Sequence, residues 1–112
     1  MNQDLFRLHA QLLVQHQALY DKLDEVETPE EARAIITEMQ ELLHRIDLVQ
    51  GLLFRQTTTA LADSLQKVDA ADEELTRALD AADKVTDIIA GIGKYLGVVD
   101  QAIDLAKTLA DA

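Results

Sequence analysis

The chain has no cysteine, a single proline and only four glycines among its 112 residues. The absence of cysteine excludes a disulfide framework, thiol catalysis and cysteine-ligated zinc, and it agrees with a reducing cytoplasm. An all-β domain needs a turn signal about every 8–12 residues, which so few prolines and glycines do not provide. The absences therefore exclude the disulfide-rich, collagen-like and all-β classes.

Helix-forming residues make up much of the chain instead. Alanine and leucine occur 16 and 18 times, and with glutamate, lysine and arginine they account for 52 of the 112 residues. Such a share is typical of long helices, and the length suits one domain. We therefore expect residues 1–112 to form a single all-α domain.

Basic residues are scarce as well: 10 lysines and arginines stand against 21 aspartates and glutamates, for a net charge of −11. This charge repels phosphate groups, so we expect neither nucleic acid nor anionic lipid as a direct partner. The longest stretch without charge, residues 8–20, contains two histidines and three glutamines, unlike the roughly 20 apolar residues of a membrane span. Since Met1–Asp4 does not open a secretory signal, the sequence predicts a soluble cytoplasmic protein without integral membrane association.

Apolar residues recur at helical spacing from about residue 3 to residue 26. One row repeats every seven residues and a second row with the same spacing lies beside it: Leu5, Leu12, Leu19 and Val26, then Phe6, Leu13 and Tyr20. Two adjacent rows form a stripe wider than a two-stranded coiled-coil interface. We therefore expect this helix to contact two neighbouring helices.

The segment Thr28-Pro29-Glu30-Glu31 marks the start of a second helix. Threonine at the N-cap with glutamate three residues later is a capping box, and proline is favoured at the first helical position. The connection to the first helix is then very short, which favours antiparallel neighbours.

The second helix carries a heptad pattern that Ile36 and Leu43 widen, formed by Ala32, Ile35, Met39, Leu42, Ile46, Val49 and Leu53. The pattern changes phase near residues 51–60, where Thr57, Thr58 and Thr59 form a run of weak helix formers. Two alternatives remain: a break between two helices, which the sequence favours, or one long helix with a stutter.

A third helix is expected from Leu61 to Ile89. Three of the four glycines follow it, at positions 91, 93 and 97, and they predict a turn or a loosened helix. The remaining segment, about residues 98–110, is then a short helix across the end of the bundle. The fold class predicted is an all-α antiparallel bundle of three long helices plus a short C-terminal helix.

We find no arrangement that predicts catalysis, and we expect no enzyme, cofactor or metal. His9 and His16 lie seven residues apart, whereas a metal pair on a helix needs closer spacing. The Glu41–His44 segment matches half of a di-iron helix motif, but no second copy exists. Ser64, the only serine, lacks a nucleophile motif around it.

Two acidic clusters permit a docking face for a basic protein, although solvated helix ends are the favoured explanation. Residues 21–31 hold six acids and one lysine, and residues 69–87 hold seven acids and two basic residues. An acidic surface of this kind commonly serves solubility.

The sequence leaves protein–protein interaction as the expected function, through self-association (a dimer above all) or as an adaptor or inhibitor. Its least firmly packed element is expected to be the glycine-containing C-terminal segment. We therefore predict a partner-binding patch of four residues there, Ile92, Leu96, Val99 and Ile103. The alternative is a peripheral lipid-associated protein that uses the same amphipathic segment.

Overall fold

A computed structural model of the chain describes residues 1–109. It contains four α-helices: α1 (Gln3–Lys22), α2 (Pro29–Gln50), α3 (Thr59–Ala81) and α4 (Val85–Lys107), with a short 3-10 turn, η1 (Leu23–Glu25), after α1. No strand occurs in these 109 residues. The prediction of an all-α bundle is confirmed.

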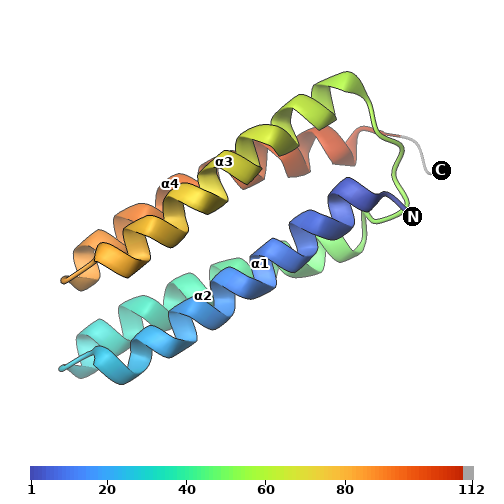
Figure 1. Cartoon of the computed structure of the whole chain (residues 1–112). Helices are drawn as coiled ribbons and strands as arrows, with labels where there is room; N and C mark the ends of the chain where they lie inside the picture. Colours follow the sequence, from blue (N-terminus) through green and yellow to red (C-terminus); the bar gives the residue numbers. More distant parts are fainter. Residues whose placement is uncertain (110–112) are drawn as a thin grey trace.

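The helices form two antiparallel hairpins, α1–α2 and α3–α4, which lie side by side in an elongated molecule of 47 × 22 × 17 Å (Figure 1). Helix α1 packs on α2 and α3, while α4 packs on α3 and α2. Helices α2 and α3 therefore occupy opposite corners, and residues 51–58 cross one end of the bundle to join them. The hairpins meet at that end and diverge toward the other (Figure 1).

The predicted capping box begins α2. The Thr28 hydroxyl oxygen accepts a hydrogen bond from the Glu31 N–H (3.1 Å) and donates to the Glu31 carboxylate (3.2 Å). Pro29 occupies the first helical position. The short connection predicted from this motif is present, and α1 and α2 are antiparallel neighbours.

The break between α2 and α3 is also confirmed, so a single continuous helix is excluded. Helix α2 ends at Gln50, and Thr58 becomes the N-cap of α3 because its side chain accepts a hydrogen bond from the Leu61 N–H (3.2 Å). The threonine run therefore supplies a helix cap, a position at which this residue type is favoured.

The prediction of the last turn is wrong. The third helix ends at Ala81 rather than near Ile89, and α4 is a full-length helix of 23 residues along the bundle, not a short one across its end. The turn between them contains Ala82, Asp83 and Lys84 and no glycine. Composition alone therefore gave no signal for this turn.

The three glycines near the C-terminus lie inside α4. A Cβ atom on Gly91 would stand 3.4 Å from Leu75 Cδ1 and 3.8 Å from the Ala78 Cβ, which is ordinary van der Waals contact, so this position faces α3. Gly93 and Gly97 face open space on the outside of the helix. The sequence pattern indicated a turn because glycine is rare in helices, whereas Gly91 lies in a helix–helix contact.

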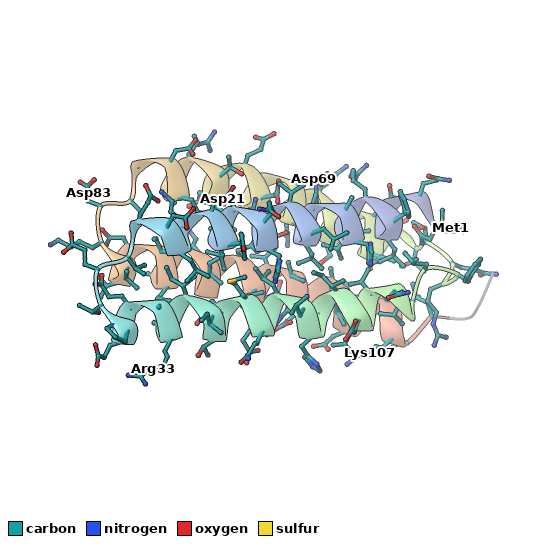
Figure 2. The ribbon with its side chains drawn as sticks, turned by 90° about the horizontal axis from the view of Figure 1, so that it is seen from below. Met1, Asp21, Arg33, Asp69, Asp83 and Lys107 are labelled. Carbon is teal, nitrogen blue, oxygen red and sulfur yellow. The ribbon has the colours of Figure 1, made fainter. Side chains whose placement is uncertain are left out.

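The heptad rows predicted for α1 and α2 form much of the core. Fully buried leucines from α1 meet buried residues of α2, and the set comprises Leu5, Leu8, Leu12, Leu19, Ile35, Leu42 and Val49. Charged side chains such as Arg33 and Lys107 point away from the bundle (Figure 2). Among the described residues, no helix combines the length and hydropathy that crossing a membrane requires.

Candidate functional site

The predicted partner-binding patch on α4 lies in the core. The exposed fractions of Ile92, Leu96, Val99 and Ile103 are 0%, 6%, 0% and 2%. Because α4 runs along the bundle, this face packs against α2 and α3. The expectation that it stays exposed is wrong, and the folded bundle does not present it to a partner or to lipid.

A different group of large apolar side chains is exposed, on the α1–α2 hairpin. These residues, named here the α1–α2 seam, are between 41% and 58% exposed: Phe6, Leu13, Tyr20, Ile36 and Leu43. Three come from α1 at seven-residue intervals and two from α2 at the same interval. The seam is therefore a continuous apolar row rather than scattered surface residues.

Contacts on the other flanks of α1 and α2 establish where the seam lies. Helix α1 contacts α3 through Gln11, whose Nε2 donates to Asp69 Oδ1 (2.8 Å). Helix α2 contacts α4 through Arg45, which donates from Nε and Nη2 to the Asp100 carboxylate (2.8 and 2.9 Å). This bidentate bond is the main cause that raises the pKa of Arg45. The seam residues lie on the sides of α1 and α2 that point away from α3 and α4. There the two helices face each other and solvent.

In the α1–α2 hairpin, the seam residues of α2 lie at heights between those of α1. At one end the Asn2 N–H donates to the Leu53 carbonyl (2.6 Å), and at the other a short connection joins Lys22 to Pro29. Leu13 is therefore level with a point midway between Ile36 and Leu43. From Tyr20 to Phe6 the side chains alternate between the helices, with an axial step of about 5 Å and a total length of about 21 Å.

The surface around the seam carries almost no charge. Helix α1 has no charged residue between positions 8 and 20, and its neighbours here include His9, His16 and Gln17. On α2 the adjoining positions are Gln40, Asp47 and Gln50. In a chain with a net charge of −11, Asp47 is the only carboxylate among the positions named.

The second apolar row of α1 does not contact the second neighbouring helix, contrary to the prediction. Helix α1 does touch two neighbours, as predicted, yet its contact with α3 uses polar residues, Arg7, Gln11 and Gln15. Phe6, Leu13 and Tyr20 were not needed for that contact and remain about half exposed. The excess apolar row was the sequence signal for this surface.

The histidines do not converge. His9 and His16 are half-buried at the edge of the seam, while His44 and Glu41 are exposed. The Glu41 carboxylate accepts a hydrogen bond from Arg45 Nη1 (2.7 Å). Within residues 1–109, no three histidine, aspartate or glutamate side chains are grouped so that they could hold a metal ion.

The acidic clusters come together in part at the end where the hairpins diverge. A cleft of about 660 Å³ separates the hairpin tips, with Glu25, Glu27, Glu30, Glu31 and Asp83 among its acidic lining. Apolar residues, including Val26, Ala34 and Ile88, also line it. The rest of the second cluster lies along α3, apart from Asp87 in the first turn of α4, so the two clusters do not form one surface.

A buried glutamine links α1 to α3 at the edge of the core. Gln15, only 1% exposed, donates from Nε2 to Asp72 Oδ1 (3.0 Å) and to Thr76 Oγ1 (3.1 Å). The Tyr95 hydroxyl is buried and has no hydrogen-bond partner of good geometry among the described residues. Burial, reinforced by the nearby Asp72 carboxylate, raises the pKa of Tyr95 far above its ordinary value, so the hydroxyl stays neutral.

We expect Tyr95→Phe to leave the free energy of unfolding unchanged or to raise it by up to about 1 kcal/mol. Removing a buried polar group that lacks a good partner also removes its desolvation cost. Urea denaturation at neutral pH measures the effect, with the exposed Tyr20→Phe as the control. A loss of more than about 1 kcal/mol would show that the hydroxyl is well paired.

The remaining nucleophile candidate is largely buried. Ser64 is 7% exposed and lies on α3 between the buried leucines 61 and 65. A reacting serine needs a base within hydrogen-bond reach and space for a substrate. Its position in the helix packing instead makes Ser64 a small core residue.

Comparisons with protein-family models, with curated proteins and with solved structures give no match for this chain. The chain is therefore described by its structure alone. It is a four-helix bundle of two hairpins, and one hairpin carries the exposed apolar seam.

Proposed function

We propose that this chain is a non-catalytic protein-binding module whose binding surface is the α1–α2 seam. One observation carries the proposal: five large apolar side chains, each about half exposed, form a single row within a strip of low charge. Contiguous apolar patches that are rimmed by polar residues mark interaction sites on otherwise polar proteins.

The shape and charge of the surface favour a protein over other partners. The net charge of −11 repels nucleic acid and anionic lipid. A row about 21 Å long with side chains every 5 Å or so matches the spacing of apolar anchors on a partner helix. The two aromatic residues, Phe6 and Tyr20, are of the types enriched in protein interfaces.

Photo-crosslinking tests the proposal. We expect benzoylphenylalanine in place of Leu13 to give a discrete crosslinked protein species in the source cells. The same group in place of Val14 is expected to give none, because Val14 is 63% exposed but points to a different face of α1. Equal crosslinking from both positions, or none from Leu13, would contradict the seam as a binding surface.

A further inference from the structure

We propose that the occupant of the α1–α2 seam is a second copy of this chain, in a two-fold symmetric dimer. The two-fold axis passes level with Leu13, at right angles to the helices, so that α1 packs on the partner's α1 and α2 on the partner's α2. This inference rests on the proposed function, since it names the protein that the seam binds.

The order of side chains along the seam is self-complementary. The row begins with Tyr20, ends with Phe6 and has three aliphatic residues between them. A two-fold axis at Leu13 exchanges the two ends, so that Tyr20 meets the partner's Phe6 and the leucines at position 13 meet each other. On α2 the same axis lies midway between Ile36 and Leu43. Each Ile36 therefore meets the Leu43 of the other copy. An isologous interface requires this correspondence.

Charge gives a second, independent argument. Two copies of a chain with a net charge of −11 repel each other least where they meet through a surface poor in carboxylates, and the seam, with Asp47 beside it, is such a surface. On α2, Asp47 and Arg33 lie at similar distances on either side of the axis. The dimer therefore brings Asp47 level with the partner's Arg33, whose side chain is 73% exposed in the single chain. A strongly basic partner would instead find its complement in the acidic groups outside the seam.

The available area suits a dimer. Five side chains that are about half exposed offer on the order of 500 Å² of apolar surface per copy. Stable interfaces bury about 800 Å² per partner, with an apolar centre and a polar rim. His9, His16, Gln17, Gln40 and Gln50 surround the seam and supply such a rim.

Sedimentation equilibrium of the full chain measures the association. We expect a concentration-dependent dimer whose dissociation constant rises about 30-fold with Leu13→Glu, since symmetry places two buried carboxylates together. Val14→Glu is the matched control, with the same charge one residue away, and is expected to leave the constant within about twofold. A monomer at all concentrations, or equal effects of the two variants, overturns the dimer.

Cysteine crosslinking tests the symmetry without background, because the chain contains no cysteine. We expect Leu13→Cys to form a disulfide-linked dimer under mild oxidation and Val14→Cys to form none. Phe6→Cys and Tyr20→Cys are expected to crosslink when mixed, but Phe6→Cys alone is not, since its two copies lie about 21 Å apart in the dimer. Crosslinking of Phe6→Cys with itself overturns the two-fold arrangement.

Failure of the dimer and failure of the protein-binding function give different results. If the purified chain is a monomer while the Leu13 photo-crosslink joins it to another protein, the self-association is overturned and the binding function stands. If neither the purified chain nor the crosslinking shows a partner at Leu13, both are overturned.

Discussion

Replacing Leu42 by alanine is expected to lower the free energy of unfolding by about 3 kcal/mol. Leu42 is fully buried on α2 and packs in the core with residues of α1. Truncation removes the free energy of burying the side chain and leaves a cavity that rigid helices fill only partly. For a domain of this size the melting temperature is expected to fall by roughly 10–20 °C.

The neighbouring residue provides a matched control. Leu43 is 44% exposed, so Leu43→Ala is expected to change the free energy of unfolding by less than about 1 kcal/mol. Both variants are measured by urea denaturation in dilute solution, where association contributes least. Similar losses for the two variants would contradict the placement of Leu42 in the core and of Leu43 on the seam.

Asn2→Ala is expected to cost about 2–3 kcal/mol, a large effect for a polar residue near a chain end. The Asn2 side chain caps α1 by accepting from the Asp4 and Leu5 N–H groups (3.0 and 3.1 Å). Its Nδ2 also donates to the Arg55 carbonyl (2.9 Å) and to Thr57 Oγ1 (2.7 Å). One side chain therefore caps the start of α1 and binds the segment that links the two hairpins.

The variant Asn2→Asp separates these two roles. Aspartate keeps the acceptor that caps α1 but lacks the amide that donates to residues 55 and 57. We expect it to recover about 1 kcal/mol of the loss, the share of the helix cap. If Asn2→Asp were as stable as the natural chain, the bonds to the linking segment would contribute nothing.

The fold was predictable wherever local chemistry decides it. The Thr28–Pro29 start of α2 and the seven-residue rows of α1 and α2 depend on neighbours along the chain, and all were found from sequence. The final turn was not, because residues 82–84 contain no proline or glycine. Gly91 instead lies inside α4, where it faces Leu75 and Ala78 of α3.

The candidate site could be predicted only in part. A second apolar row on α1 and the flanking residues Ile36 and Leu43 were visible as surplus hydrophobic surface. Which apolar face stays exposed depends on how the four helices pack against one another. This is a property of the tertiary structure, and the pattern along a single helix does not determine it. The sequence therefore identified the seam residues but placed the partner patch on α4, whose face is needed to complete the core.

The arrangement of the helices also affects how the chain reaches its fold. Most helix–helix packing joins helices that are consecutive in sequence, α1 with α2 and α3 with α4. Native contacts of short sequence separation form with little loss of chain entropy, and helical proteins of this kind fold within microseconds to milliseconds. We therefore expect each hairpin to form as a local folding unit before one hairpin docks on the other.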